Sequence, residues 1–480
     1  MTQGTGPAWR SRQERREMEA GAVEAGRVPE ALRPEFPPGA DLPPDGLTRR
    51  TMLGLMGASV ALGGLAACRR PVEEIVPFVQ APEDFRPGLP RYYATTLPIG
   101  AHAYGVLVES HEGRPTKVEG NPRHPASRGA ATAWMQAAIL DLYDPDRLRG
   151  ATRRAPGTGS GEAGAPVEAA WSDFAAWWQE SGATAGADDG ARLAVLAGAH
   201  CSPTLARVAR QLRSRFPASR WVVHEPAGDE AVYEGLRRAT GSARRPLADL
   251  GRARTVLALD ADLFLTESEP IRNARGHATR RRAEGEEPAR LYVVESTLSV
   301  TGGNADHRLR LPSRHIGAFA AAVAAELGVA AGELAADDLP APARARAAVV
   351  ARDLAASRGE AVVLAGRRQP PEVHALVHRI NQSLGAVGPV LQLDEVPEGA
   401  AGAWGGADLA DLARAIRAGE IDTLVVLGGN PAYTAPADLE LPALLAAVPH
   451  VVALVHEANE TAALAEWTLP LAHPFETWGD

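Results

Sequence analysis

The sequence predicts an α/β protein: a small N-terminal β-hairpin region followed by two parallel-sheet α/β domains, the second incomplete. Three observations favour this class. Short alternating segments fill 91–120, and beyond residue 192 continuous apolar segments alternate with helical ones, as in buried parallel sheets. The chain of 480 residues is also long enough for about two or three cores. We expect a leader over 1–68, a tether and hairpin region over 69–150, a first α/β domain over 151–340 and a second over 341–480.

Composition limits the classes of function. Hydrophobic residues make up 45% of the chain and charged residues 23%, which is typical of a water-soluble body. The formal net charge of −9 argues against nucleic acid as a partner. The only two cysteines, Cys68 and Cys201, are too few for a cysteine-ligated iron–sulfur cluster, which needs about four thiolates.

The leader contains the pattern of an export signal. Arg49 and Arg50 stand together ahead of a Gly- and Ala-rich apolar run over 52–67, and Leu-Ala-Ala precedes Cys68. A paired arginine before a mildly apolar run is the address of twin-arginine export, and the run is shorter than the roughly 20 residues of a spanning helix. We predict export through Arg49 and Arg50 and lipidation of Cys68. The alternative is a chance arginine pair beside an ordinary buried helix.

A proline-rich tether over 71–90 leads to the predicted hairpin. Segments 91–96 and 105–110 alternate as strands, and a turn at 111–114 joins the second strand to 115–120. The run Asn-Pro-Arg-His-Pro at 121–125 ends this sheet, and 131–142 is predicted to form a helix with one apolar face.

The hairpin carries a family resemblance. The run GVLVESHEGRPTKVEGNPRHPASRGA, which begins at Gly105, resembles the N-terminal hairpin of the molybdopterin oxidoreductase superfamily. Over 9–148 the chain resembles one branch more closely, through the twin arginines, Cys68, RRPVEEIVPFV, YYATT and AILDLYDPDR. That branch is the large iron–sulfur subunit of alternative complex III, a quinol:acceptor oxidoreductase. The resemblance continues with gaps to Asp480, a point inside the family's second α/β domain, so the chain resembles the N-terminal part of that subunit.

The resemblance implies cofactors and partners. Catalytic members carry a four-cysteine cluster around this hairpin, but no cysteine lies between 69 and 200 here, so we expect iron–sulfur clusters only in the family's C-terminal region. Molybdopterin is the superfamily's cofactor, and we expect none in this chain. The implied partners are membrane quinol-oxidising subunits, cytochrome c subunits and, through lipidated Cys68, the membrane surface. The implied location is the periplasmic side of the bacterial inner membrane.

Beyond the hairpin, Gly- and Ala-rich linkers flank one aromatic helix. Its Trp171, Phe174, Trp177 and Trp178 have the spacing of a packed helix face rather than of a cofactor platform. The α/β part that follows is predicted to contain strands at 192–198, 221–224, 255–259, 290–294, 361–365, 423–427 and 450–455, and helices at 203–215, 229–240, 314–327 and 371–384.

Two loops after strands are candidate cofactor-binding segments, because ligands bind at the carboxyl edge of open α/β sheets. The first contains Gly428, Gly429 and Asn430, whose backbone amides could approach a phosphate. The second is 456–461, and its candidate residues are Glu457, Asn459 and Thr461. The resemblance implies that such loops cradle a pterin dinucleotide in catalytic relatives. The alternative is that glycine and proline only turn the chain.

Other candidates are weaker. Asp260 and Asp262, at the end of a predicted strand, fit either a ribose contact or a helix cap. Cys201 lies beside His200, which fits a metal ligand or nucleophile less well than a structural pair, because no further ligands stand at metal spacing. No signature of a catalytic triad, zinc protease or paired carboxylates is present, so no catalytic residue is assigned.

These observations predict an exported scaffold portion of a respiratory quinol:electron acceptor oxidoreductase, without pterin or its own iron–sulfur cluster. Two alternatives stay open. One is an active molybdopterin-dependent oxidoreductase chain, and the other is a lipoprotein module that binds a small nucleotide-like ligand.

Overall fold

The computed structural model describes residues 88–154, 164–180, 189–282, 288–400 and 408–480, together with Arg12 and Arg86. The predicted export signal at Arg49 and Arg50, the lipidation site Cys68 and the tether over 71–85 lie outside these residues. Residues 90–480 belong to one compact unit, which is the part described below. Within the described residues, no helix combines the length and apolar character that crossing a membrane requires.

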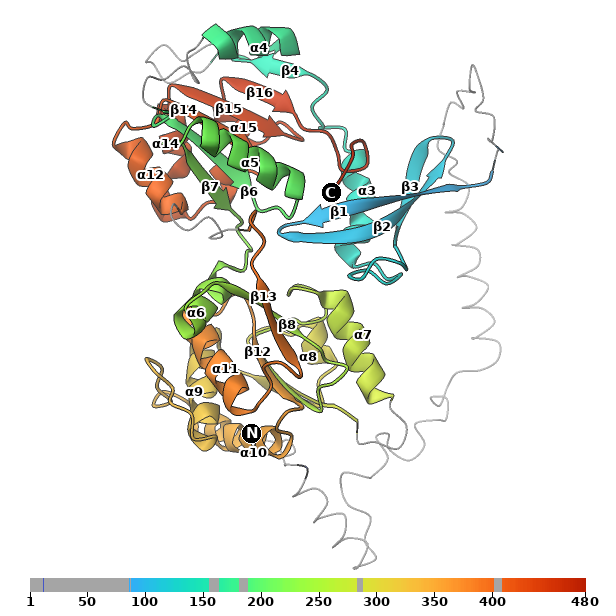
Figure 1. Cartoon of the computed structure of the whole chain (residues 1–480), viewed down its shortest axis with the longest axis vertical. Helices are drawn as coiled ribbons and strands as arrows, with labels where there is room; N and C mark the ends of the chain where they lie inside the picture. The colour runs from blue at the N-terminus through green and yellow to red at the C-terminus, as the bar shows by residue number, and fades with distance from the viewer. Residues whose placement is uncertain are drawn as a thin grey trace, which may run out of the picture. The chain divides into compact units, whose positions relative to one another are not determined.

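The N-terminal sheet is antiparallel and has the order β1-β2-β3 (Figure 1). Its strands are β1 (Arg91–Ile99), β2 (His102–His111) and β3 (Arg114–Gly120), and helix α3 (Ala133–Leu142) packs on it with Thr132 as its N-cap. Glu112 and Gly113, with φ of 56° and 81°, make the β2–β3 turn. The core between sheet and helix contains Leu97, Tyr104, Val106, Val108, Val118 and Met135. The predicted hairpin region is thus confirmed.

A seven-stranded sheet forms the first α/β core, with the order β5-β4-β16-β15-β14-β6-β7. Its strands are β4 (Ala151–Arg153), β5 (Val167–Ala169), β6 (Leu193–Gly198), β7 (Arg220–His224), β14 (Thr423–Leu427), β15 (His450–Val455) and β16 (Trp467–Pro470). The strands from β16 to β7 are parallel to their neighbours, whereas β4 and β5 pair antiparallel at one edge. The predicted parallel sheet is therefore confirmed.

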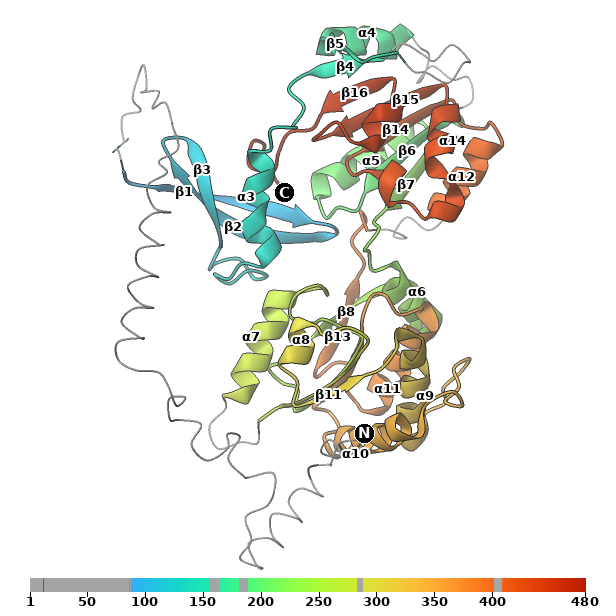
Figure 2. The same cartoon turned by 180° about the vertical axis from the view of Figure 1, so that it is seen from behind.

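Helices cover both faces of this sheet (Figures 1 and 2). One face packs on α12 (Leu409–Arg417), α14 (Leu441–Ala447) and α15 (Glu460–Leu464). The other packs on α4 (Trp171–Glu180) and α5 (Pro203–Arg215). The aromatic helix behaves as predicted: Trp177 is buried, and the Phe174 ring lies 5.4 Å from that of Trp467. Trp171 does not belong to the packed face that its spacing predicted, because half of its surface is exposed.

The second α/β core is a four-stranded parallel sheet of order β11-β10-β9-β12. Its strands are β9 (Thr255–Leu259), β10 (Arg290–Glu295), β11 (His307–Arg310) and β12 (Ala361–Ala365). The helices of this part are α6 (Glu230–Thr240), α7 (Pro270–Arg281), α8 (Val300–Gly303), α9 (Ile316–Glu326), α10 (Ala341–Ala356) and α11 (Pro371–Ser383). An antiparallel pair, β8 (Arg244–Ala248) and β13 (Leu391–Glu395), completes it.

The two cores are interleaved in the sequence, which differs from the predicted division at residue 340. The chain leaves the seven-stranded sheet after β7, forms the second core, and returns after β13 to add β14 beside β6. Residue 340 lies between α9 and α10, which pack in one hydrophobic cluster. The physical reason is strand pairing: Val425 of β14 lies between Val195 of β6 and Val452 of β15, and local sequence carries no record of this long-range register.

Candidate functional site

The structure brings the two predicted loops together at the carboxyl end of the seven-stranded sheet. Strands β14 and β15 are adjacent and parallel, so the segments that follow them leave the sheet side by side. Gly428 and Gly429 have φ of 74° and 73°, a conformation that glycine adopts at little cost, and they turn the chain into the short helix α13 (Pro431–Thr434).

The side chains of these loops bind one another. The Asn430 Oδ1 accepts hydrogen bonds from the backbone N–H of Thr461 at 3.2 Å and from its hydroxyl at 2.8 Å. The Asn430 Nδ2 donates to Glu460 at 2.5 Å, and the Thr461 hydroxyl accepts from the N–H of Ala432 at 3.0 Å. Thr461 is fully buried. Asn430 and Thr461 therefore form a lock between the two loops.

The remaining predicted residues lie at the periphery of this lock. The Asn459 Nδ2 donates to the Gly429 carbonyl at 3.3 Å, and its Oδ1 accepts from the N–H of Ala462 at 3.0 Å, so Asn459 caps α15. The Gly428 N–H donates to the Leu454 carbonyl at 2.9 Å. Glu457 is exposed, and its backbone forms a bridge with Arg147.

The loops do not fit the pyrophosphate of a pterin dinucleotide. A diphosphate needs donors and positive charge, but the polar side chains of Asn430 and Thr461 are already used within the lock. The loops themselves carry negative charge, because Glu457 and Glu460 are both exposed, and the guanidinium of the adjacent Arg147 is paired with Glu476. The geometry favours the alternative interpretation, in which these residues shape and join the loops.

Asp260 and Asp262 are also occupied by neighbouring protein groups. The Asp260 carboxylate is buried and accepts hydrogen bonds from Ser296, Ser313 and Gln369 at 3.0–3.2 Å. The Asp262 Oδ1 accepts from the N–H and hydroxyl of Thr301, at 3.0 and 2.8 Å. Because Thr301 lies in the first turn of α8, Asp262 acts as a cap for a helix distant in sequence.

Cys201 and His200 follow β6 at the carboxyl end of the seven-stranded sheet. Burial raises the pKa of the Cys201 thiol and lowers the pKa of the His200 imidazole, so both favour their neutral forms. Among the residues that the structure describes, no three His, Cys, Asp or Glu side chains are grouped so that they could hold a metal ion.

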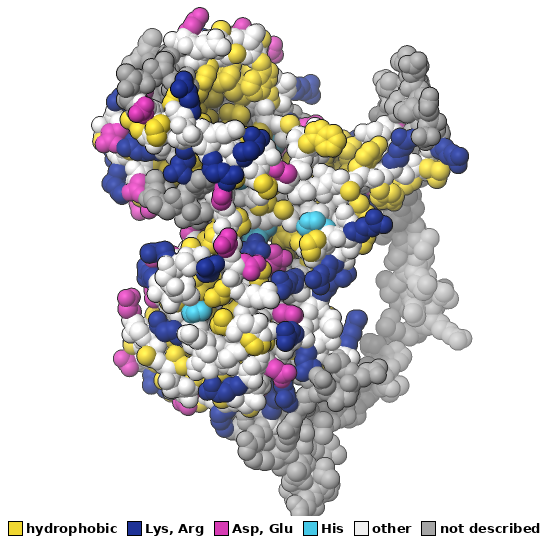
Figure 3. Space-filling view, viewed as in Figure 1, with side chains coloured by type: hydrophobic (Ala, Val, Ile, Leu, Met, Phe, Trp, Pro, Cys, Tyr) yellow, Lys and Arg dark blue, Asp and Glu magenta, His cyan; other side chains and the backbone are white. Residues whose placement is uncertain are grey.

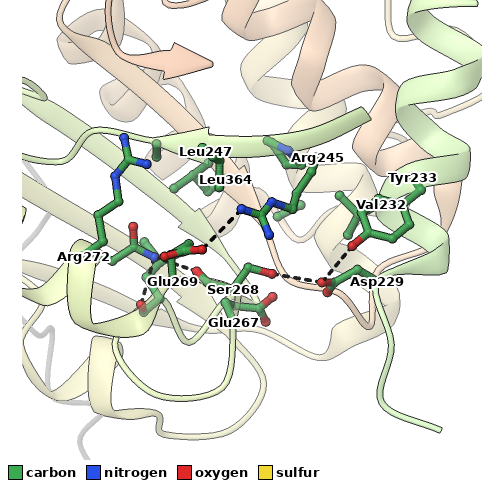
Figure 4. Close-up of a pocket in the computed structure, with 15 residues that line it drawn as sticks. Asp229, Val232, Tyr233, Arg245, Leu247, Glu267, Ser268, Glu269, Arg272 and Leu364 are labelled. Carbon is green, nitrogen blue, oxygen red and sulfur yellow. Dashed lines mark hydrogen bonds and ion pairs between the residues drawn. The ribbon is translucent and has the colours of Figure 1, made fainter. Parts of the chain in front are cut away.

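Sequence reasoning missed a buried charged cluster that joins the start of β2 to loops of the second core, and Figure 4 shows its Asp229, Glu267 and Ser268. The cluster consists of His102, Asp229, Glu267, Ser268 and Arg367. The Ser268 hydroxyl donates to Asp229 at 2.9 Å, and the His102 Nε2 lies 3.5 Å from the same carboxylate. The Arg367 Nε lies 3.3 Å from Asp229 and 3.5 Å from Glu267.

Cavities adjoin this charged cluster. One cavity, of about 300 Å³, is lined by every residue of the charged cluster except Ser268. Tyr104 and Trp134 also line it. A second of about 500 Å³ shares Glu267 and Arg367 and extends to Glu295 and Arg368. A third of about 60 Å³ lies beside Arg245 and Glu269, whose side chains are 3.4 Å apart (Figure 4). The cavity walls therefore combine apolar surface with charged groups of both signs.

Burial raises the pKa of both Asp229 and Glu267, and neighbouring positive charge lowers it. Burial raises the pKa of Glu267 to about 7, because the opposing effect of Arg367 is smaller. Burial also raises the pKa of Asp229, but the His102 hydrogen bond and the Arg367 charge outweigh it, so the net pKa is lowered. At neutral pH, Asp229 is therefore ionised, while Glu267 is divided between its two forms.

The positions of these residues in the chain explain why the sequence did not predict the charged cluster. Arg367 follows β12 and Glu267 follows β9, so the rule that ligands bind at the carboxyl edge of a sheet could have found these two. His102 is contributed by the start of β2, and no local pattern connects it with residues that follow the α/β strands.

Comparison with known proteins supports the fold. No protein-family model matches the chain. The chain is 24% identical over 429 residues to the menaquinone reductase molybdopterin-binding-like subunit of Nitratidesulfovibrio vulgaris, covering 82% of this chain and 60% of that protein. It is 31% identical over 104 residues to a sulfite dehydrogenase subunit of Allochromatium vinosum, covering 22% of this chain and 11% of that protein.

A solved structure shares the architecture. Acetylene hydratase from Pelobacter acetylenicus matches with a TM-score of 0.59 and 15% identity, over 77% of this chain and 62% of that protein. The chain thus spans about 60% of the length of both the menaquinone reductase protein and the hydratase. The chain thus has sequence similarity to a molybdopterin-binding-like subunit, and it shares the α/β fold of the hydratase.

Proposed function

We propose that the chain is a non-catalytic scaffold subunit of an exported respiratory quinol:electron acceptor oxidoreductase of the alternative complex III type. In this proposal the chain binds neither pterin nor an iron–sulfur cluster. Lipidated Cys68 anchors it at the periplasmic side of the inner membrane, where it holds quinol-oxidising membrane subunits and cytochrome c subunits together.

One observation carries the proposal: the loop lock between Asn430 and Thr461. Side chains that would have to face a dinucleotide instead satisfy one another, and the exposed Glu457 and Glu460 would repel its phosphates. Two curated relatives, described as subunits of a menaquinone reductase and of a sulfite dehydrogenase, are consistent with a subunit role in a redox complex.

The test is the molybdenum, tungsten and pterin content of the native protein, extracted from membranes together with its partners. We expect less than about one tenth of a cofactor per chain. One cofactor per chain would overturn the scaffold proposal and would favour an active molybdopterin-dependent oxidoreductase. Co-purification of cytochrome c and quinol-oxidising subunits in the same preparation tests the assembly role separately.

A second candidate function is a module that binds a small nucleotide-like ligand. The observation that favours it is the cavity of about 300 Å³ lined by Arg367 and Asp229, and a ligand would bind there by exchanging its own anion or hydroxyl groups for the contact of 3.3 Å between these two side chains. Titration of the full chain with guanosine monophosphate, followed by calorimetry, tests it. Binding that Arg367→Met abolishes would support this function, and the absence of heat at millimolar nucleotide would count against it.

A further inference from the structure

The charged cluster differs from the surface charges of the chain in its burial. On the face shown in Figure 3, acidic and basic side chains are interspersed over the surface, where water solvates them. In the cluster, the side chains of Asp229, Glu267 and Arg367 are only 8%, 14% and 20% exposed. Removing a charge from water is costly unless an opposite charge or a hydrogen bond compensates it. The partners of these groups therefore decide what the site can bind.

Carboxylates outnumber guanidinium groups at the cavity of about 300 Å³ beside this cluster, which we call the Tyr104 cavity. The acidic and basic residues that line it are His102, Glu225, Asp229, Glu267 and Arg367. Asp229 has most of the available partners, because it accepts from Ser268 at 2.9 Å and lies within 3.5 Å of both His102 and Arg367. The charge of Asp229 is thus compensated within the chain.

Glu267 and Glu225 are compensated less well. The Glu267 carboxylate accepts long hydrogen bonds of 3.2 and 3.4 Å from the backbone N–H of Arg367, and it lies 3.5 Å from the Arg367 Nε. Among the described residues, no ion pair involves Glu225. Burial raises the pKa of Glu225 and raises the pKa of Glu267 to about 7, because the nearby positive charge does not offset burial. An additional cation in the cavity would stabilise both carboxylates.

The hydroxyl of Tyr104 is an unused hydrogen-bond donor in the same cavity. Tyr104 lies on β2, lines the cavity and is 5% exposed. In the part of the chain that the structure describes, its hydroxyl has no hydrogen-bond partner, whereas the hydroxyl of Tyr233 on the same wall lies 3.5 Å from Asp229. Burial raises the pKa of Tyr104 to about 12, so it keeps its proton. A buried hydroxyl without a partner costs about 1–3 kcal/mol, and a ligand oxygen that accepts from it would recover this.

Arg367 supplies positive charge next to the uncompensated carboxylate. Its Nη1 donates to the Ala227 carbonyl at 2.6 Å, and its Nη2 donates to none of the described residues. The Arg367 Nε and the Glu267 carboxylate are 3.5 Å apart. In an α-amino acid, the ammonium nitrogen and the carboxylate oxygens are separated by about 3 Å, because only two bonds join the nitrogen to the carboxyl carbon. The two ends of such a ligand would therefore meet charges of opposite sign at a matching separation.

The rest of the cavity wall suits an uncharged side chain. Apolar and aromatic residues make up this wall: Ile99, Ala101, Trp134, Tyr233, Leu265 and Pro270. A volume of about 300 Å³ is at the lower end of small-molecule sites, which favours a ligand the size of a single amino acid.

We propose that the Tyr104 cavity binds a zwitterionic α-amino acid with an uncharged side chain. Arg367 and the Tyr104 hydroxyl hold its carboxylate, and Glu267 and Glu225 hold its ammonium group. The ligand brings one charge of each sign, so it compensates the buried groups without adding net charge to the site. This inference does not rest on the scaffold role, and it gives the cavity a different ligand from the nucleotide of the second candidate function.

The first test compares ligands that differ in one charged group. L-leucine, isocaproate, which lacks the ammonium group, and isoamylamine, which lacks the carboxylate, share one branched chain. Calorimetric titration of the full chain is done above pH 7, where Glu267 is mostly ionised. We expect L-leucine to bind at least ten times more tightly than either analogue. Equal binding of an analogue, or no binding of L-leucine and L-alanine at about 10 mM, would overturn the proposal.

The second test uses substitutions in the cavity wall. Tyr104→Phe should weaken L-leucine binding about tenfold, whereas Tyr92→Phe, exposed on the adjacent strand β1, should bind as the wild type does. The melting temperature of Tyr104→Phe should not fall, because the lost hydroxyl has no partner in the chain. A lower melting temperature with unchanged binding would show that the hydroxyl serves the fold and would overturn its role in the site.

Glu267 provides an independent variant. Glu267→Gln keeps the shape of the side chain but removes its charge, so L-leucine binding should weaken at least tenfold. Glu457→Gln, which changes an exposed carboxylate, is the matched control and should leave binding unchanged. Equal affinity of the two variants for L-leucine would overturn the proposed ammonium contact.

Failure here is distinguishable from failure of either proposed function. Binding of guanosine monophosphate without binding of L-leucine would overturn this inference and favour the nucleotide module. Cofactor content and co-purification with redox subunits test the scaffold role, and neither result depends on whether the Tyr104 cavity binds an amino acid.

Discussion

Thr461 shows at the scale of one residue how the carboxyl end of the seven-stranded sheet is held. Its hydroxyl and backbone N–H both reach Asn430, and the same hydroxyl accepts from Ala432. Because Thr461 is fully buried, water is not available to replace a lost partner. The loop lock therefore contributes to stability.

Asn430→Ala should lower the free energy of unfolding by about 1–3 kcal/mol, because it leaves the Thr461 hydroxyl and amide without their acceptor. Urea denaturation followed by tryptophan fluorescence measures the change. Glu457→Gln, on the same pair of loops but exposed, is the control and should change stability by less than about 0.5 kcal/mol. Equal effects of the two substitutions would contradict the lock.

The raised pKa of Glu267 leads us to predict that the free energy of unfolding depends on pH. Burial raises the pKa of its carboxyl from an ordinary 4.5 to about 7, so the folded state binds the proton more tightly than the unfolded state does. Stability is therefore highest below pH 4.5 as far as this group is concerned, and this contribution is lost as the pH rises toward 7.

Glu267→Gln should remove this dependence. The unfolding free energy of the variant relative to the wild type should rise by roughly 3 kcal/mol between pH 4.5 and 7 and stay level above that range. Urea titrations at intervals of half a pH unit measure it. Glu457→Gln should reproduce the wild-type curve, and a flat difference for Glu267→Gln would show that the buried carboxyl is not perturbed.

At the scale of elements, the hairpin region depends on a close approach between β3 and the segment before α3. A Cβ atom on Gly120 would lie 1.9 Å from the Ala130 carbonyl oxygen, so only glycine fits. Gly120 is buried at the end of β3, and the backbone on both sides of the contact is held by hydrogen bonds.

Gly120→Ala should therefore destabilise the protein by about 1–3 kcal/mol, because the added methyl forces backbone to move. Gly150→Ala is a matched control, since a Cβ there meets no atom within 4 Å. Thermal unfolding of both variants gives the comparison. A loss of stability in Gly150→Ala as large as that in Gly120→Ala would show that chain flexibility, not the close approach, is responsible.

At the scale of the whole molecule, the proposed role depends on the leader. Cys68→Ser removes the thiol that would receive a lipid, and we expect mature protein to move from the membrane fraction to the soluble periplasmic fraction. Immunoblots of the two fractions, with a periplasmic marker enzyme as control, measure the shift. Unchanged retention in high salt would show that another contact holds the chain at the membrane.

Export itself is a separate prediction. Replacing both Arg49 and Arg50 with lysine keeps the charge but removes the arginine pair that the export pathway reads, so precursor should accumulate in the cytoplasm. The Arg69→Lys, Arg70→Lys double variant changes the arginine pair directly after Cys68 and should be exported normally. Equal export of the two double variants would contradict the twin-arginine interpretation.

Much of the fold could be predicted from local patterns. The hairpin strands and the parallel strands occur where alternating or continuous apolar segments predicted them. A strand buried on one face alternates apolar and polar residues, and a strand buried on both faces is continuously apolar. The aromatic helix likewise packs as its spacing indicated. The candidate loops were found because each follows a continuous apolar strand, and glycine and proline also mark the end of β14.

The tertiary structure alone decided how these pieces combine. It placed β14 beside β6, so that the two α/β cores are interleaved, and it brought His102, Asp229, Glu267 and Arg367 into one buried charged cluster. It also turned Asn430 and Thr461 toward each other rather than toward a ligand. The physical reason is the same in each case: burial of a segment is set by its own side chains, whereas pairing depends on residues far away in the chain, and local sequence does not record which of them meet.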